Sequence, residues 1–385
     1  MRFKKLSLFI CKFWEKSIKN FSRLSFLEKI FFYFLCFLEF FYRVGFRVVV
    51  FLKKLKRNKS KKFVKNKFFW NDIFPWPDAS VPDTFESNGP AIISVGNLTV
   101  GGTGKSLLVK KLVKFYRDKN LSCAIFLRGY GRSSKDEKNL ILGPDSFDLD
   151  VVSAGDEAVM LAKNLSIPVV VGKDRFLSLK LFEKFCDEKS KKIDCIILDD
   201  AYQNFDLKKD FEILIFDARA PFGNWHCLPA GPLREKDFSR ADVIVLSHAD
   251  EVDKKSLNEV KDFFLKKFPQ DKVFCGKHSV CGIKNYKDEK VFNAKTKKTL
   301  ALAGIGSFSG FIESLKKYGI DVKKELRYPD HFNYTKKDLK KIISTMHYFG
   351  CDQIITTQKD WEKLKKLVGD DKKLFFVLEI EFEFF

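Results

Sequence analysis

A glycine-rich loop between an apolar run and an amphipathic stretch constrains this chain more than any other feature. The apolar run 91–95 predicts a buried strand, and apolar residues at helical spacing predict a helix over 105–118. Between them lies the sequence Gly-Gly-Thr-Gly-Lys-Ser, residues 101–106. A flexible loop that leads into a helix N-terminus presents backbone N–H groups and the positive end of the helix dipole to an anion. The stretch therefore predicts a phosphate-binding loop.

The side chains of this loop suit a nucleoside triphosphate and its metal ion. Lys105 would reach the β- and γ-phosphates, and the hydroxyl of Ser106 would ligate Mg²⁺. The residues expected to surround the phosphates are Thr99, Gly101, Gly102, Thr103 and Gly104. The full pattern has Gly where this chain has Thr99. A glycine-rich turn that contains Gly-Lys-Ser by chance is the alternative, but the flanking strand and helix favour nucleotide binding.

Positive charge is concentrated at the N-terminal end. The 385-residue chain has a net charge of +21, and residues 1–70, with 19 Lys and Arg against three acidic residues, supply +16 of it. Phe, Leu and Trp alternate with these basic residues, which is typical of a segment that binds an anionic membrane surface rather than nucleic acid. The nine cysteines have no C-x-x-C spacing and no companion His at zinc-like distances, so we expect reduced thiols and no structural zinc site.

Within this leader, residues 25–52 predict one long helix. Ser25 and Glu28 have the spacing of a capping box, and an apolar run follows. Glu39, Arg43 and Arg47 interrupt the run at i,i+4 spacing, which places them near one helix face. Three charges disfavour a transmembrane helix, so we expect a helix that lies in the cytoplasmic leaflet. A spanning helix and a soluble amphipathic helix packed on the body are the alternatives.

The rest of the chain predicts an α/β protein. Pro- and Gly-rich residues 71–90 predict a linker. We expect a P-loop NTPase-like kinase domain over 91–290 and a smaller α/β domain over 291–385. The strands predicted by apolar runs are 91–95, 123–127, 168–171, 195–199, 213–217, 243–247, 300–303 and 353–357. Because their hydrophobicity is continuous rather than alternating, they predict a mostly parallel sheet that is buried on both faces.

Two acidic pairs are candidates for the chemistry. An apolar strand ends in Asp199 and Asp200, where a P-loop fold has its Mg²⁺-side aspartate; an ordinary strand followed by a capping Asp is the alternative. Asp156 and Glu157 precede an apolar helix, and acids at this position can merely cap it. A kinase that acts on a hydroxyl also needs a carboxylate to accept the proton, and Asp156 is placed for that role.

Basic residues in turns and at strand ends are candidates for phosphate binding. Arg234 could hold a phosphate through two parallel hydrogen bonds and Glu235 could complete the metal shell, although a structural loop with a surface ion pair would have the same sequence. Arg128 follows a strand end and could contact phosphates. His331 could orient or tune a carboxylate base, although a lone His is more often structural. The Thr-Gln-Lys-Asp sequence 357–360 predicts no role.

The order of these motifs resembles the tetraacyldisaccharide 4′-kinase family, the lipid A 4′-kinases of Gram-negative bacteria. The motifs are Val-Gly-Asn-Leu-Thr-Val-Gly-Gly-Thr-Gly-Lys-Ser, Arg-Gly-Tyr-Gly-Arg, Gly-Asp-Glu, Leu-Asp-Asp-Ala-Tyr-Gln-Asn, Leu-Pro-Ala-Gly-Pro-Leu-Arg-Glu, Ala-Gly-Ile-Gly, Asp-His and Thr-Gln-Lys-Asp. The resemblance runs from about residue 91 to 361. The chain has Asn204 where the family usually has His, and Gln358 where it has Glu.

The resemblance implies that ATP with Mg²⁺ phosphorylates the 4′-hydroxyl of a tetraacylated glucosamine disaccharide 1-phosphate. It implies a P-loop domain joined to a smaller α/β domain, with the site in the cleft between them. Asp156 is then the base and His331 its partner. The residues implied for the metal ion are Ser106, Asp199 and Glu235, and the implied supporting groups are Asp200, Glu157, Arg234 and Arg128.

The expected partners are the lipid substrate and the cytoplasmic face of the bacterial inner membrane, with no nucleic acid and with the chain as a monomer. One rival hypothesis is a membrane-associated P-loop ATPase or GTPase that works as a switch or chaperone. The absence of an Asn-Lys-x-Asp pattern disfavours its GTPase form. A nucleic-acid-binding protein is the second rival, and the concentration of charge in a hydrophobic leader disfavours it.

Overall fold

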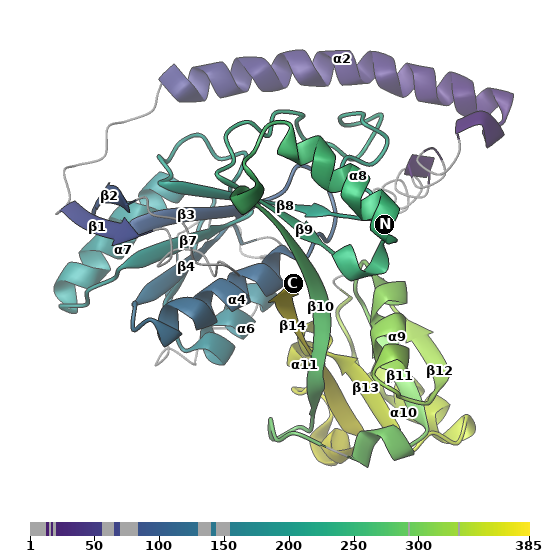
Figure 1. Ribbon diagram of the computed structural model, residues 1–385. Helices are drawn as coiled ribbons and strands as arrows, with labels where there is room; N and C mark the ends of the chain where they lie inside the picture. The colour runs from purple at the N-terminus through teal and green to yellow at the C-terminus, as the bar shows by residue number, and fades with distance from the viewer. Residues whose placement is uncertain are drawn as a thin grey trace. The chain divides into compact units, whose positions relative to one another are not determined.

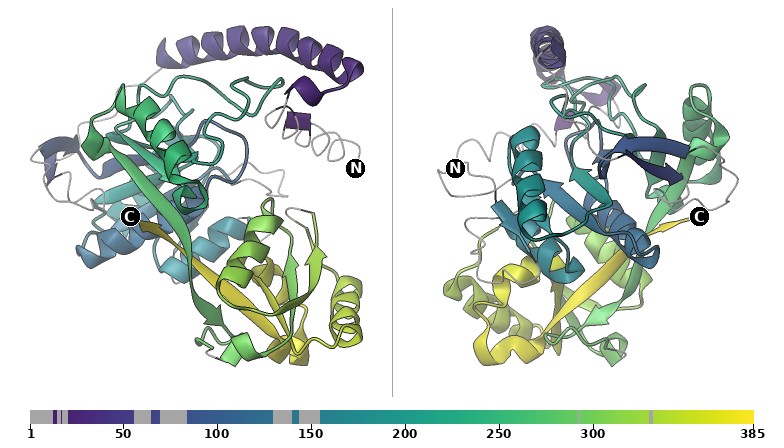
Figure 2. Two further views of the ribbon diagram at one scale, coloured as in Figure 1. Left: turned by 45° about the vertical axis from the view of Figure 1, so that its right-hand side comes forward. Right: turned by 90° about the vertical axis from the view of Figure 1, so that its left-hand side faces the viewer.

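The chain forms two compact units, drawn in Figures 1 and 2. The computed structural model describes residues 13–14, 17, 21–55, 65–69, 84–129, 140–143, 155–291, 293–329 and 332–385. The first unit comprises Met1–Arg128, Gly172–Lys277 and Phe384–Phe385, and the second comprises Gly129–Val171 and His278–Glu383. The sequence placed the boundary near residue 290, whereas this division falls within the long strand β10 and gives a segment before α7 to the second unit.

Six strands of the first unit lie side by side in the order β10-β9-β8-β3-β7-β4, and each neighbouring pair is parallel. Their bounds are β3 Ala91–Gly96, β4 Cys123–Leu127, β7 Cys195–Asp199, β8 Phe211–Asp217, β9 Val243–Ser247 and β10 Val273–Lys284. All residues of β4, β7 and β9 are buried, as their unbroken apolar sequences predict. The prediction of a mostly parallel α/β fold is confirmed.

Local sequence determines where the described helices of the first unit begin. They are α2 Phe26–Leu55, α4 Lys105–Asp118, α7 Arg175–Glu188 and α8 Lys254–Leu265. Asp174 caps α7 by accepting hydrogen bonds from the N–H groups of Phe176 (2.9 Å) and Leu177 (3.0 Å). By contrast, α4 begins after Gly104 without a side-chain cap, so its first N–H groups are left for another acceptor. The strands β1 Lys65–Phe69 and β2 Thr84–Asn88 pair antiparallel, and β2 lies within the segment predicted as a linker.

Four strands of the second unit lie side by side in the order β12-β11-β13-β14, and each neighbouring pair is parallel. Its elements are β5 Leu140–Leu142, α6 Asp156–Leu165, β6 Val169–Val171, β11 Thr299–Ala303, α9 Phe308–Lys317, β12 Val322–Arg327, α10 Lys336–Tyr348, β13 Gln353–Thr357, α11 Gln358–Leu364 and β14 Phe375–Phe384. Short 3₁₀ helices are Phe21–Arg23, Ala249–Glu251, Gln270–Lys272, Asn293–Thr296 and Gly369–Leu374. Pairs such as Ser279 with Glu383 and Lys284 with Glu379 show that β14 runs antiparallel to β10.

The Thr-Gln-Lys-Asp motif, for which the sequence predicted no role, supports the core of the second unit. Asp360 is fully buried and accepts hydrogen bonds from Gly304 N–H (3.0 Å), Tyr334 OH (3.0 Å) and Thr357 Oγ1 (2.7 Å). Burial and the neighbouring Asp360 carboxylate raise the pKa of Tyr334, so its hydroxyl stays a donor. Thr357 also caps α11. The motif therefore joins the ends of β11, β13 and the segment before α10.

The helix α2 has one face on the first unit and another in solvent. Its capping box is confirmed, because Ser25 N–H donates to Glu28 (2.8 Å) and Glu28 N–H donates to Ser25 Oγ (3.3 Å). Phe32 and Leu35 are buried. The exposed large apolar side chains of α2 are Phe26, Leu27, Ile30, Tyr33, Phe34, Phe37, Leu38, Phe40, Phe41, Val44, Val48, Val49, Phe51 and Leu52. Among the described residues, no helix combines the length and the apolar character needed to cross a bilayer.

Two backbone segments approach each other closely at the end of β3, and a substitution can test this packing. A Cβ on Gly96 would lie 2.5 Å from the Cβ of Tyr202 and 2.9 Å from its backbone nitrogen, so the two backbones approach too closely for any side chain. We expect Gly96→Ala to lower the free energy of unfolding by about 1–3 kcal/mol, measured by denaturant titration. Gly45→Ala, in an open part of α2, is the control and should cause no loss. Equal stability of the two variants would contradict this account.

Candidate active site

The phosphate loop has the geometry that its sequence predicts. Strand β3 ends at Gly96, and α4 begins at Lys105. Gly101 and Gly104 have φ angles of 133° and 85°, which side chains rarely allow. The first turn of α4 contains no acidic residue, so nothing on the helix itself opposes an anion at its N-terminus. The carbonyl of Thr103 accepts a hydrogen bond from Ser247 Oγ (2.9 Å) at the end of β9, which anchors the loop to the sheet.

A compact polar cluster lies at the carboxyl end of the sheet. Lys105 Nζ donates to Asn97 Oδ1 (2.9 Å) and lies 3.6 Å from Asp200 Oδ1. Arg234 donates to both oxygens of Asp200 (3.1 and 2.8 Å) and also to Asn97 Oδ1. The cluster brings together the loops after β3 and β7 with the Leu-Pro-Ala-Gly-Pro-Leu-Arg segment. The predicted residues Lys105, Asp200 and Arg234 therefore do meet at one site.

Electrostatics keep Asp200 ionised in this cluster. Burial alone would raise its pKa, but the hydrogen bond from Arg234 and the charges of Lys105 and Arg234 outweigh burial and hold the pKa below its ordinary value. Asp200 also has a left-handed backbone, with φ 50°, which Asp tolerates better than most residues. A carboxylate that stays charged can keep both cations in place at the mouth of the phosphate loop.

The backbone of Arg234 is fixed as firmly as its side chain. Arg234 N–H donates to Leu98 O (2.7 Å), and its carbonyl accepts a hydrogen bond from Tyr42 OH (2.9 Å) on α2. Val100 N–H donates to Pro232 O (2.8 Å). The carbonyl of Thr99 accepts from Asn97 Nδ2 (2.8 Å) and from Arg234 (3.4 Å). Thr99, which replaces a glycine of the full pattern, thus contributes backbone contacts to the cluster.

The metal-side acids have different surroundings. Asp199 is buried at the end of β7, beside Val95 of β3 in the sheet register, and its carbonyl accepts a hydrogen bond from Arg175 (2.8 Å). Glu235 is buried as well, and both of its carboxylate oxygens lie 3.1 Å from Arg240. Burial raises the pKa of Glu235, and Arg240 offsets only part of this effect. The metal role of Glu235 stays a prediction, with Arg240 as its partner in this structure.

The structure describes only some of the remaining predicted site residues. Arg128 is exposed directly after β4, and Ser106 is half-buried in the first turn of α4. The backbones of Asp156 and Glu157 begin α6 after Gly155, whose φ is 90°; their side chains lie outside the described part of the structure. His331 also lies outside the described residues. The pairing of Asp156 with His331 therefore stays a prediction.

Three residues that support the polar cluster were not predicted from the sequence. Asn97 contacts Lys105 and Arg234, Gln203 donates to Asn97 O (3.0 Å), and Arg240 stacks on Tyr202, 4.3 Å from the ring centroid. Asn97 lies two residues after the predicted strand 91–95, so its position was a usable signal. The departure Asn204 accepts a hydrogen bond from Leu207 N–H (3.3 Å), and Gln358 donates to Glu362 (3.3 Å); both contacts are local.

Comparison with known proteins agrees with this geometry. The profile of the family described as LpxK, tetraacyldisaccharide-1-P 4′-kinase, matches residues 82–384. The chain is 35% identical over 317 residues to the tetraacyldisaccharide 4′-kinase of Desulfatibacillum aliphaticivorans, covering 76% of this chain and 79% of that protein. It is 31% identical over 301 residues to the enzyme of that name from Elusimicrobium minutum, covering 75% and 77%.

A solved structure is similar to this chain in its fold. The crystal structure of LpxK from Aquifex aeolicus, described as an "apo" form in complex with ATP, has a TM-score of 0.58 and 29% sequence identity to this chain. The match covers 77% of this chain and 84% of that one. The family's sequence profile extends over the phosphate loop and the Asp200–Arg234 cluster. The chain belongs to the tetraacyldisaccharide-1-P 4′-kinase family.

Proposed function

We propose that this kinase transfers the γ-phosphoryl group of ATP to the 4′-hydroxyl of a tetraacylated glucosamine disaccharide 1-phosphate at a membrane surface. The observation that carries the proposal is the cluster of Lys105, Asn97, Asp200 and Arg234 beside the N-terminus of α4. The relatives are named for this reaction, and the Aquifex structure is described with ATP bound. Two preorganised cations next to a helix N-terminus suit a polyphosphate with several negative charges.

The cations and the carboxylate have separate tasks in this proposal. Lys105 Nζ lies 3.6 Å from Asp200 Oδ1, farther than the hydrogen-bonded Arg234, so it can turn from Asp200 to a phosphate. Arg234, with two hydrogen bonds to Asp200, stays in place and offers charge to the transferring group. Phosphoryl transfer depends mainly on such positioning and charge neutralisation, because the protein forms no covalent bond to the group.

Oxygen donors at the site fit Mg²⁺. The Ser106 hydroxyl stands in the first turn of α4 and the Asp199 carboxylate ends the neighbouring strand β7, and Mg²⁺ prefers such hard oxygen ligands. Glu235 is the third proposed ligand and would have to share its charge with Arg240. When bound, Mg²⁺ neutralises charge on the phosphates. Ser106 and Asp199 would hold it while Lys105 orients the phosphate chain.

Asp156 is the proposed base that accepts the proton of the 4′-hydroxyl, with His331 as its partner and Glu157 in support. Asp156 occupies the first position of α6, where the helix dipole stabilises a carboxylate anion and so keeps it able to accept a proton. Asp156 and His331 both fall within the second unit by residue range.

We propose that the lipid acceptor binds beside α2 and that the chain acts as a monomer at the cytoplasmic face of the inner membrane. A cavity of about 590 Å³ lies between α2 and the segment 234–240. Its lining combines apolar side chains with basic and acidic ones: Phe46, Val50, Phe51 and Phe205 with Arg43, Arg47, Lys236, Arg240, Glu235 and Asp237. A lipid phosphate offers the complementary charge and acyl chains. The exposed apolar face of α2 would keep the enzyme beside a substrate that does not leave the bilayer.

The reaction itself can be measured with γ-labelled ATP, Mg²⁺ and tetraacyl disaccharide 1-phosphate in detergent. We expect label in the lipid with the wild-type protein and none with Lys105→Ala, because that variant loses its phosphate contact. Lys114→Ala, an exposed lysine of the same helix, should leave the labelling intact. Consumption of ATP without labelled lipid would instead support a switch-type ATPase.

The base is tested by separating chemistry from nucleotide binding. Asp156→Asn should lower kcat by about 10²–10⁴-fold while the Kd for ATP stays unchanged, because a base acts only on the acceptor hydroxyl. Turnover kinetics and calorimetric nucleotide titration measure the two quantities. Asp187→Asn, at an exposed position of α7, is the control. A matching loss in kcat and in ATP affinity would argue against a base.

Membrane binding is tested with anionic lipid vesicles by cosedimentation. Replacing the exposed Phe37 and Phe41 by Ser should weaken partitioning about tenfold or more, because each ring no longer enters the bilayer interface. Added salt should weaken binding of the wild-type protein as well. The control replaces Tyr348 and Phe349, exposed aromatic residues of the second unit, by Ser. If both double variants bind like the wild type, α2 is not the membrane contact.

A further inference from the structure

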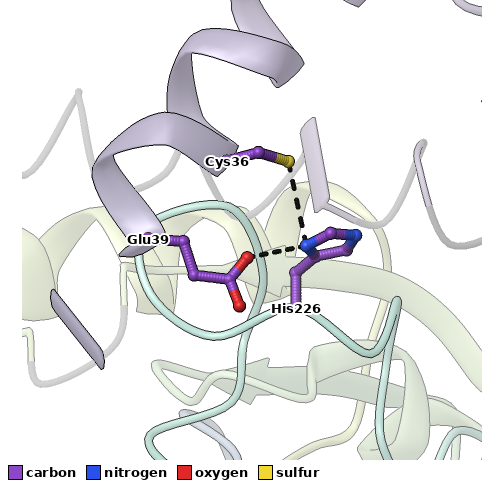
Figure 3. Close-up of side chains that lie close together, drawn as sticks. All are labelled: Cys36, Glu39 and His226. Atoms are coloured by element: carbon purple, nitrogen blue, oxygen red, sulfur yellow. Dashed lines mark hydrogen bonds and ion pairs between the residues drawn. The ribbon is translucent and has the colours of Figure 1, made fainter. Parts of the chain in front are cut away.

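Three side chains with metal-binding atoms meet where α2 lies on the first unit, outside the phosphate cluster (Figure 3). Cys36 and Glu39 come from α2, and His226 comes from the segment that leads to Arg234. His226 Nδ1 lies 2.7 Å from Glu39 Oε2 and 3.8 Å from Cys36 Sγ. All three ligand atoms lie within 4.8 Å of one another. Figure 3 shows the thiol and the carboxylate both directed toward the same ring nitrogen.

The surroundings hold the carboxylate and the imidazole in this orientation. Glu39 is only 5% exposed, and its Oε1 accepts a hydrogen bond from Cys227 N–H (2.9 Å) and lies 3.7 Å from Lys236 Nζ. This leaves Oε2 directed at His226. The ring of His226 packs edge-on against Phe32, with ring centroids 5.2 Å apart, and its backbone N–H donates to Asn224 Oδ1 (3.2 Å). Such supporting contacts are typical of built metal sites.

We propose that Cys36, Glu39 and His226 bind a divalent transition-metal ion, with Zn²⁺ as the natural occupant. A thiolate, an imidazole and a carboxylate form a donor set that favours Zn²⁺ over Mg²⁺ or Ca²⁺. Tetrahedral Zn²⁺ with ordinary bond lengths requires S···N and N···O separations of about 3.6 and 3.4 Å. The observed S···N and N···O distances are 3.8 and 2.7 Å. The N···O distance is that of a hydrogen bond, and small side-chain movements would lengthen it enough to admit the ion. Solvent at the half-exposed His226 supplies the fourth ligand.

The charge balance of the site is favourable. The thiol of Cys36 releases its proton to solvent when the metal–sulfur bond forms, so the thiolate and the Glu39 carboxylate offset the two charges of the ion. Lys236 is the cation that opposes metal binding, but it faces Oε1 of Glu39 rather than the atom directed at His226. A bidentate carboxylate is therefore not available, and the carboxylate binds through Oε2 alone.

The sequence could not indicate this site. The absence of C-x-x-C spacing and of a nearby His predicted no structural zinc, but that argument considers only ligands close in the sequence. Here Cys36 and Glu39 share a helix face at i,i+3 spacing, and His226 arrives from a loop 187 positions beyond Glu39. A metal ion at this place would fasten α2 to the segment of Arg234, in addition to the hydrogen bond from Tyr42 OH to Arg234 O.

The test is metal binding by the untagged full-length protein, stripped with a chelator and titrated with Co²⁺ and then Zn²⁺. We expect one equivalent of Co²⁺ with a thiolate charge-transfer absorption, which Zn²⁺ displaces. Cys36→Ser should abolish this absorption and weaken binding at least about tenfold. Cys186→Ser, which removes another half-buried free cysteine, should bind like the wild type. Because no ATP or lipid is present, the result does not depend on the proposed function.

A second measurement guards against variants that misfold. Hydrogen exchange of the wild-type protein should show stronger protection of the α2 segment around Cys36 and Glu39 when Zn²⁺ is bound, because the ion joins that helix to the loop of His226. His226→Ala should lose this metal-dependent protection while circular dichroism shows an intact fold. Failure of the wild-type protein to bind Co²⁺ stoichiometrically, or unchanged charge-transfer absorption in Cys36→Ser, would overturn the proposal.

Discussion

The ion pair of Asp200 with Arg234 is the interaction on which the site depends. Phosphate binding needs cations side by side, and Lys105 and Arg234 would repel each other if no anion lay between them. Asp200 supplies that anion at 3.6 and 2.8 Å, and Asn97 accepts hydrogen bonds from both cations. Each charge-assisted bond of this kind contributes on the order of 1.5–3 kcal/mol. The cluster therefore holds three separate loops in the arrangement that a nucleotide requires before the nucleotide arrives.

The segment that carries Arg234 also connects the Asp200–Arg234 cluster to α2. The side chain of Arg234 points to the phosphate loop, its carbonyl accepts from Tyr42 of α2, and the next residues line the cavity beneath that helix. The proposed function requires that a water-soluble donor and a membrane-bound acceptor meet. A few consecutive residues of this segment contact both the phosphate cluster and α2, because the side chain of Arg234 binds Asp200 while its carbonyl accepts from Tyr42.

The sequence predicted those features that depend on local patterns. The strand, glycine loop and helix over 91–118 and the acidic end of β7 follow from apolar runs and short motifs, and the structure has them at those positions. The long strand β10 was missed because its lysines and glycines interrupt the apolar pattern. The contacts of Asn97 and of Asp360 were missed for a different reason. Both depend on side chains that come together only through the fold, and no periodicity reports them.

Charged residues interrupt the apolar sequence of α2, so this helix of 30 residues lacks the apolar character that crossing a membrane requires. Glu39 is buried against the protein, paired with His226 and Lys236, and Arg43 and Arg47 line the cavity. These charges therefore lie on the face that attaches the helix to the first unit. In a bilayer core each of them would cost several kcal/mol, whereas here Glu39 contacts protein groups and the two arginines line a cavity. Most of the other exposed side chains of α2 are apolar. One face bound to protein and one free apolar face is the distribution that a helix lying in a membrane interface requires.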